Sequence, residues 1–219
     1  MIDLQREEDV FVLCLDDDEN RFSPATLDEL TAALDTVEAA EGPRALVTIG
    51  TGKFYSNGLD LDWVTQNPEQ WGPYLDRVHG LYGRLLKLPM PTVAAINGHA
   101  FAGGAMLALA HDFRVMRADR GYFCLPEVDL GLGFTPGMSA LIQARLPVNT
   151  AHEAMLTGRR YGGEDAREAG IVHQTAAEDK VRPTAIGIAA PLAAKNGTVM
   201  AQIRAAMYAP ALALLAPPV

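Results

Sequence analysis

Short apolar runs alternate with amphipathic stretches in the first half of the chain. Residues 10–16 and 44–50 are rich in valine, leucine and isoleucine, which predicts two buried strands. Between them, Ser23-Pro24 has the pattern of an N-cap followed by proline at the first helical position, and it opens an amphipathic run that extends to Glu41. A strand, helix, strand order favours parallel pairing through a crossover. The pattern therefore predicts a parallel sheet covered on both faces.

The same alternation recurs further along the chain. Residues 73–89 have helical spacing, residues 92–97 predict a strand, and residues 102–112 predict a helix that begins after a glycine turn. Two further strands are expected within residues 113–118 and 121–127.

Other segments have weaker or different patterns. Residues 51–63 are expected to begin as a loop, and residues 65–73 are expected to be a turn-rich spacer. The pattern becomes mostly helical from residue 131 onward. An α/β core followed by a helical C-terminal part is the architecture that this order predicts.

Composition narrows the class of protein. The chain has 219 residues, of which 49% are hydrophobic and 21% are charged, enough apolar material for one sizeable core. A formal net charge of −9 argues against a nucleic-acid partner or an acidic membrane surface, so small molecules are the expected partners. Cys14 and Cys124 lie in apolar runs without metal-binding spacing, which predicts buried thiols in a reducing compartment and no metal site.

Neither end of the chain resembles a targeting signal. The N-terminus is acidic, and the C-terminal Pro-Pro-Val is not a peroxisomal address, so we expect a cytoplasmic location. Residues 92–110 carry no charged side chain, but Asn97, His99 and the glycines among them disfavour a transmembrane helix. A buried strand followed by a buried helix is expected there.

Two strand-to-helix turns are candidate binding elements, because helix N-termini present unpaired N–H groups. In one of them, Gly103-Gly104 stands at the helix start, where an acceptor can approach the backbone closely. The pair either supplies an oxyanion donor or only permits tight helix packing. The other turn, residues 54–60, either supplies a second backbone donor or is a plain turn at Asn57-Gly58.

Glu127 is the candidate general base. It follows a proline and is surrounded by aliphatic residues, so desolvation is expected to raise its pKa toward neutrality. The alternative is a surface glutamate at the end of a strand. Asp129 is a weaker candidate, because it would point to the opposite face if the segment is extended.

Three stretches together resemble the crotonase superfamily of enoyl-CoA hydratases and isomerases. They are KFYSNGLDLDW, PTVAAINGHAFAGGAMLALAHDFRV, and LPEVDLGLGF followed by LTGRRYGGEDAREAGIV. Their order and spacing are those of the family over about residues 10 to 175, and the resemblance is strongest to the Δ3,Δ2-enoyl-CoA isomerases, particularly the plant-type branch.

The resemblance implies a fold and a substrate. It implies a ββα spiral core over residues 1–175 and a helical segment over residues 176–219, at an oligomer interface in a homotrimer or hexamer. The implied substrate is an acyl-CoA thioester. No separate cofactor is implied, because coenzyme A is part of the substrate.

The resemblance also implies roles for particular residues. The family's two oxyanion N–H groups fall on Asn57 and Gly103, and Glu127 matches one of the two glutamates of hydratases, whereas Met106 stands in place of the other. Methionine neither accepts a proton nor orients water. No carboxylate lies near Thr135-Pro136, where another isomerase branch has its glutamate. The implied substrate-binding residues are Ser56, Asn57, Gly58, Leu59, Asp60, Gly103 and Gly104.

This pattern favours an isomerase in which Glu127 moves a proton from C2 to C4 of a 3-enoyl-CoA. Hydration, thioester hydrolysis and CoA binding without turnover are the alternatives. Four aromatic residues either line the acyl channel or belong to the core: Tyr55, Trp63, Phe101 and Phe134. His99 is expected to be a structural histidine with its hydrogen bonds satisfied.

Overall fold

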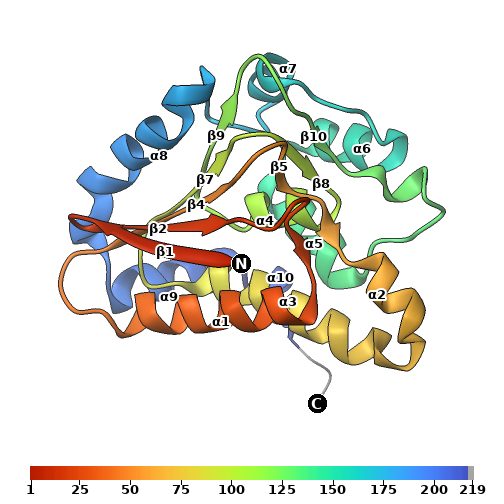
Figure 1. The fold of residues 1–219 in the computed structure, drawn as a ribbon, viewed down its shortest axis with the longest axis horizontal. Helices are drawn as coiled ribbons and strands as arrows, with labels where there is room; N and C mark the ends of the chain where they lie inside the picture. The colour runs from red at the N-terminus through yellow and green to blue at the C-terminus, as the bar shows by residue number, and fades with distance from the viewer. Residues whose placement is uncertain (217–219) are drawn as a thin grey trace.

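A six-stranded sheet lies at the centre of the computed structural model, which describes residues 1–216 (Figure 1). All neighbouring strands are parallel except the first pair, which forms an antiparallel hairpin. In spatial order the strands are β1 (Ile2–Glu7), β2 (Val10–Leu15), β4 (Ala45–Gly50), β7 (Thr92–Ile96), β9 (Phe113–Arg117) and β11 (Gln174–Ala176).

Smaller sheets and helices complete each turn of the chain. A parallel three-stranded sheet has the order β10 (Phe123–Cys124), β8 (His99–Phe101), β5 (Phe54–Ser56), and β3 (Arg21–Phe22) pairs with β6 (Gly58–Leu59). The helices are α1 (Pro24–Ala39), α2 (Leu61–Gln66), α3 (Trp71–Lys87), α4 (Gly103–Leu109), α5 (Pro136–Arg145), α6 (Val148–Thr157), α7 (Gly163–Glu168), α8 (Val181–Ala189), α9 (Thr198–Met207) and α10 (Ala209–Leu215). Short 3-10 turns cover Pro68–Gln70, Pro126–Val128, Glu178–Lys180 and Ala190–Lys195.

The chain repeats one unit three times. Each of β4, β7 and β9 is followed by one strand of the three-stranded sheet and then by helix. Because both sheets are traversed in the same sequence order, the chain advances as a spiral. The predicted α/β class and ββα spiral are confirmed.

Both faces of the large sheet are covered, as predicted. Along β2, Phe11 and Leu13 point into the main core with α1, α3 and α4, whereas Val10 and Val12 pack on the opposite side with α8. Figure 1 shows α8 on one side of the sheet and α1 with α3 on the other. Such strands need apolar residues on both faces, which explains their nearly continuous apolar runs.

The helix start predicted from the N-cap sequence Ser23-Pro24 is confirmed. The Ser23 hydroxyl accepts the N–H of Thr26 at 3.1 Å, and α1 begins at Pro24. The predicted turn-rich spacer at residues 65–73 is confirmed at the 3-10 turn Pro68–Gln70 but is wrong at both ends, because α2 extends to Gln66 and α3 begins at Trp71. The expected loop at the start of residues 51–63 is confirmed, since Thr51, Gly52 and Lys53 precede the strand Phe54–Ser56, which was not predicted.

The N-terminal strand β1 was not predicted. Ile2 and Leu4 are half-buried between exposed neighbours, so the apolar side of β1 is short. The strand lies at the sheet edge and carries exposed charged residues, which is a common way to protect an edge from further pairing. A charged edge strand has little of the apolar signal that marks a central one.

Two arginines hold the C-terminal end of α4, the helix whose first turn enters the site. Arg114 donates to the carbonyl of His111 at 3.2 Å, and Arg145 donates to the carbonyls of Leu109 at 2.9 Å and Asp112 at 3.0 Å. These bonds satisfy the carbonyl of the last residue of α4 and two carbonyls in the turn that follows it. They fix α4 relative to the body of the protein.

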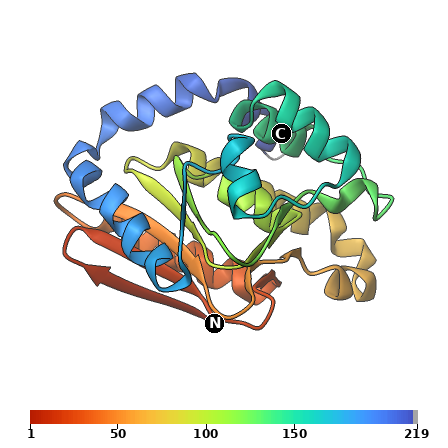
Figure 2. The ribbon, with the colours of Figure 1, turned by 90° about the horizontal axis from the view of Figure 1, so that it is seen from above.

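The C-terminal segment is helical, as predicted, and it wraps around the molecule from α8 toward α5 (Figure 2). Strand β11 lies across the predicted boundary at residue 175, and that division stays a prediction. Residues 217–219, the tripeptide considered as a targeting signal, lie outside the described residues. Within residues 1–216, no single helix is long and apolar enough to cross a membrane, and α9 with α10 meets that test only as a pair bent by 84°.

Both cysteines are free thiols. Cys124 is buried, as predicted, whereas Cys14 is only half-buried. Cys14 lies in β2 between the buried Leu13 and Leu15, but its own side chain is less completely covered, so the prediction of a buried thiol is wrong there.

Candidate active site

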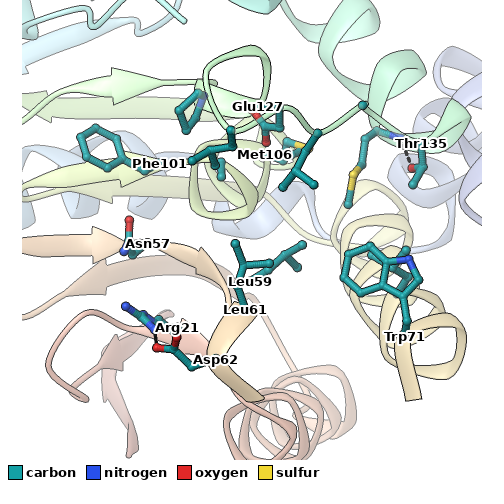
Figure 3. A pocket seen from close by; sticks show the side chains of 17 residues that line it. Arg21, Asn57, Leu59, Leu61, Asp62, Trp71, Phe101, Met106, Glu127 and Thr135 are labelled. Atoms are coloured by element: carbon teal, nitrogen blue, oxygen red, sulfur yellow. Dashed lines mark hydrogen bonds and ion pairs between the residues drawn. The ribbon is translucent and has the colours of Figure 1, made fainter. Parts of the chain in front are cut away.

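A cavity of about 410 Å³ lies between the first turn of α4, β6, and the segment that leads into α5. Helices α2 and α3 form its other wall. Figure 3 shows Glu127 and Met106 near its middle, with Asn57, Arg21 and Asp62 toward one end and Trp71 and Thr135 toward the other.

The two ends differ in chemistry. At the first end, Arg21 pairs with Asp62 at 2.6 Å and with Glu19 at 2.7 Å. At the other end, Trp71 and Leu75 lie one helical turn apart on α3, and both line the cavity. The cavity therefore has a polar end and a mainly apolar end.

Glu127 lies in the 3-10 turn Pro126–Val128 and faces the cavity. Its residue is 6% exposed, and its Oε2 atom is buried without a hydrogen-bond partner among the described residues. Burial penalises the charged form and raises the pKa of Glu127 to about 7. A carboxylate of this pKa is suited to accept and return a proton near neutral pH.

Met106 occupies the position one turn into α4, where it is 1% exposed and lines the cavity. Its thioether carries no titratable proton. Of the described residues that line the cavity, the acids are Glu127 and Asp62, and Asp62 is bound to Arg21. Glu127 is therefore the acid in this cavity that has no ion-pair partner among the described residues.

The backbone before α4 is strained. Ala102 has φ 48° and ψ −120°, a region that L-residues rarely occupy and that costs about 1–3 kcal/mol. The carbonyl of Ala102 accepts the N–H of Met106 at 3.1 Å and so points into the helix. In the planar trans peptide, the N–H of Gly103 then points the opposite way, out of the helix start beside the cavity wall formed by Ala102.

Gly103 is packed tightly against β6. A Cβ atom on Gly58, whose φ is +80°, would lie 2.5 Å from the Gly103 nitrogen. The buried Tyr82 hydroxyl donates to the carbonyl of Gly103 at 2.9 Å. These contacts set the direction of the first turn of α4.

The prediction that the Asn57 amide is an oxyanion donor is wrong. This N–H donates to the carbonyl of Glu19 at 2.9 Å, and the Asn57 side chain donates to the Glu19 carboxylate at 2.8 Å. The Gly58 amide is bound to Ser56 Oγ at 3.1 Å, and the Asp60 amide to the Tyr74 hydroxyl at 2.9 Å.

The predicted substrate-binding residues divide into two groups. Asn57 and Leu59 line the cavity, as does Ala102, next to Gly103. The others build the turns. Ser56 donates to the carbonyl of Asn20 at 2.7 Å, Asp60 caps α2, and a Cβ on Gly104 would meet the Ser56 carbonyl at 2.1 Å.

Of the four aromatic candidates for the acyl channel, one lines the cavity and three pack elsewhere. Phe101 lines the cavity. Tyr55 is fully buried with its hydroxyl 2.7 Å from Thr48 Oγ1, Trp63 packs on Tyr74, and Phe134 packs against the main core.

The two weaker catalytic candidates, His99 and Asp129, do not line the cavity. His99 stacks on Phe101 with ring centroids 4.8 Å apart, but its buried Nδ1 atom has no partner among the described residues, so the prediction of satisfied hydrogen bonds is wrong. Asp129 follows a 3-10 turn rather than an extended segment, and its carboxylate lies against Gly158.

Several lining residues were missed by sequence reasoning, notably Arg21, Trp71, Leu75 and Met138. The helical spacing of Trp71 and Leu75 indicates that they share a helix face, but the turn-rich spacer predicted at residues 65–73 includes Trp71. Within residues 1–216, no cluster of three or more His, Cys, Asp or Glu side chains is arranged to hold a metal ion.

Comparison with known proteins agrees with this arrangement. The chain matches the family model described as enoyl-CoA hydratase/isomerase over residues 5–216. It is 38% identical to enoyl-CoA delta isomerase 2, peroxisomal, from Arabidopsis thaliana, with 95% of this chain and 92% of the relative covered. Enoyl-CoA delta isomerase 3 from the same organism is 39% identical at the same coverage.

A solved structure is similarly close in fold. A probable enoyl-CoA hydratase from Mycobacterium tuberculosis H37Rv superposes with a TM-score of 0.91 at 29% identity, covering 98% of this chain and 91% of that one. With the spiral core and the buried Glu127 in place, these matches show that the chain belongs to the enoyl-CoA hydratase/isomerase family of the crotonase superfamily. The resemblance seen in the sequence is confirmed.

Proposed function

We propose that this protein is a Δ3,Δ2-enoyl-CoA isomerase that moves a double bond from C3 to C2 of an acyl-CoA thioester. Its family and relatives support an enoyl-CoA isomerase or hydratase type of activity. The observation that favours isomerisation is a cavity in which Glu127 faces Met106 rather than a second acid.

In the proposed reaction, ionised Glu127 takes a proton from C2 of the 3-enoyl-CoA. The electron pair of the broken C–H bond forms a dienolate, with negative charge on the thioester oxygen. The same carboxyl group returns the proton at C4, which leaves the double bond between C2 and C3. Proton transfer by one carboxyl group uses no metal or redox cofactor.

Two backbone amides are proposed to hold the thioester oxygen. The Gly103 N–H leaves the start of α4 beside the cavity. In the neighbouring turn, the amides of Asn57, Gly58 and Asp60 are bound elsewhere, so we assign the second donor to Leu59, which lines the cavity. Removing a donor of this type costs about 2.7–4 kcal/mol in the transition state.

The orientation of the substrate follows from the two ends of the cavity. We propose that the thioester carbonyl lies between Leu59 and Gly103, that the CoA portion leaves by the end near Arg21, and that the acyl chain runs toward Trp71. Contacts with the unreactive CoA part would position the reacting carbons.

Wild-type protein is expected to convert 3-hexenoyl-CoA to 2-hexenoyl-CoA at least about 100-fold faster than it adds water to 2-hexenoyl-CoA, because a second positioned catalytic carboxylate is worth about that much. Absorbance of the conjugated thioester measures the first rate, and mass analysis of 3-hydroxyacyl-CoA measures the second. Comparable rates would favour a hydratase, release of free CoA would favour thioester hydrolysis, and binding without either reaction would favour a non-catalytic CoA-binding protein.

The isomerisation rate should rise with pH. Glu127 must be ionised to accept the C2 proton, and burial raises its pKa to about 7. We expect kcat/KM to increase about tenfold per pH unit well below pH 7 and to level off above it. Initial rates between about pH 5 and 9 test this. A rate that is constant or falls as the pH rises through this range would contradict Glu127 as the base.

Two broader assignments accompany this proposal. We propose a homotrimer or hexamer with the C-terminal segment at the interface, for which the exposed apolar side chains of Val199, Ile203 and Met207 on α9 are the support. We also propose a cytoplasmic location, for which the two free cysteines are the support.

A further inference from the structure

We propose that the site selects acyl-CoAs with long unsubstituted hydrocarbon tails, and that Trp71 and Leu132 on the cavity rim set this preference. The inference rests on the proposed function, because it takes the substrate to be an acyl-CoA with its reacting carbons beside Glu127.

The apolar side chains that line the cavity are buried along its inner wall and exposed along its outer wall. Met106 and Met138, which are 1% and 4% exposed, form its inner wall. The outer wall has much more exposed apolar side chains: Leu61 at 37%, Trp71 at 39%, Leu132 at 43% and Leu130 at 54%. This half of the cavity is an apolar slot open to water.

The rim residues come from two separate parts of the chain. Leu61 begins α2 and Trp71 begins α3, whereas Leu130 and Leu132 lie in the segment between the Glu127 turn and α5. Together they leave an apolar surface that a ligand can cover from both sides. A chain that covers such surface gains hydrophobic free energy in proportion to the area removed from water.

The position of Glu127 limits which part of a substrate reaches the rim. C2 to C4 must lie beside its carboxylate, near the middle of the cavity (Figure 3). Carbons beyond C4 extend either toward the Arg21–Asp62 ion pair or toward Trp71, and a hydrocarbon is favoured only at the apolar end. A four-carbon acyl group therefore ends before the rim, and longer tails pass over it.

The Thr135 hydroxyl, a polar group at the apolar end of the cavity, already has hydrogen-bond partners. The Thr135 hydroxyl lies 2.9 Å from His79 Nε2 and accepts the N–H of Met138 at 3.2 Å as the cap of α5. Burial lowers the pKa of His79, so its ring is neutral at neutral pH. A hydroxylated or carboxylated tail gains no charged partner here, which favours a plain hydrocarbon.

The test compares binding of butyryl-, octanoyl- and dodecanoyl-CoA, which are saturated and do not react, by titration calorimetry. Full burial of a methylene is worth about fourfold in affinity and half burial about twofold, so dodecanoyl-CoA should bind at least about tenfold more tightly than butyryl-CoA. Trp71→Ser and Leu132→Ser should each reduce this ratio about threefold or more while leaving butyryl-CoA affinity unchanged.

Leu156→Ser is the matched control. Leu156 is exposed on α6 and does not line this cavity, so the same chemical change there should leave the ratio unaltered. Thermal unfolding of each variant separates loss of folding from loss of contact, and Leu132, on an exposed segment, is the variant that should fold most like wild type.

Equal affinity for all three chain lengths, or an unchanged ratio in both rim variants, would overturn the inference. The binding series needs no turnover, so it is independent of the isomerase assay. Absence of isomerisation with the chain-length ratio intact would refute the proposed reaction and support the acyl slot. Isomerisation of 3-hexenoyl-CoA with a flat binding series would support the reaction and refute the slot.

Discussion

Glu127→Gln is expected to bind acyl-CoA and to lose isomerisation by about 10²–10⁴-fold in kcat, the usual contribution of a positioned general base. The amide of glutamine has nearly the shape of the carboxylate but accepts no proton from C2. Octanoyl-CoA affinity by calorimetry and conversion of 3-hexenoyl-CoA by absorbance measure the two effects separately. Unchanged conversion in this variant would refute the mechanism.

The loss should not come from unfolding. Burial raises the pKa of Glu127 from 4.5 to about 7, so the folded state holds this proton more tightly than the unfolded state does. The resulting stability is complete below pH 4.5 and is lost as the pH rises through about 7. A neutral glutamine removes this dependence, and the variant should lose less stability than wild type between about pH 5 and 8.

Asp129→Asn provides the matched control for this substitution. Asp129 lies two residues from Glu127, but its carboxylate is directed at Gly158 and it does not line the cavity. The same acid-to-amide change there should leave kcat for 3-hexenoyl-CoA within about twofold of wild type. A large fall in both variants would point to disruption of the shared 3-10 turn rather than to loss of the base.

The repeating core was predictable because its strands are buried on both faces. Residues 44–50 and 92–97 are continuous apolar runs that predict strands, and β4 and β7 lie there. The edge strand β1 and the two- and three-residue strands β3, β5, β6 and β8 are too short or too polar to give this signal. Their pairing depends on contacts between distant parts of the chain.

The candidate base of the site was predictable from its side-chain chemistry, whereas a backbone donor was not predictable from residue type. Glu127 stood out as an acid among aliphatic residues, and its burial and raised pKa agree with that prediction. The choice of Asn57 as a backbone donor was wrong because an amide is directed by its hydrogen bonds rather than by its residue type. The partner of this amide is the carbonyl of Glu19, which lies in another turn.

Gly58→Ala is expected to lower kcat by about 10²–10³-fold, which is the effect of losing one oxyanion donor. Gly58 has φ +80°, and a Cβ there would lie 2.5 Å from the Gly103 nitrogen and 2.9 Å from its Cα. The contacting atoms are backbone, so the first turn of α4 or the β6 turn must move. Either movement displaces the Gly103 or the Leu59 amide that we assign to the thioester oxygen.

Gly52→Ala separates the local contact from the general cost of alanine in a left-handed conformation. Gly52 has φ +63°, but nothing lies within 4 Å of the position of its Cβ. Both variants should lose about 1 kcal/mol of unfolding free energy from backbone strain. Only Gly58→Ala should lose kcat, as measured with saturating 3-hexenoyl-CoA, because only its Cβ meets Gly103. Equal kcat in the two variants would mean that the contact between β6 and α4 does not position an oxyanion donor.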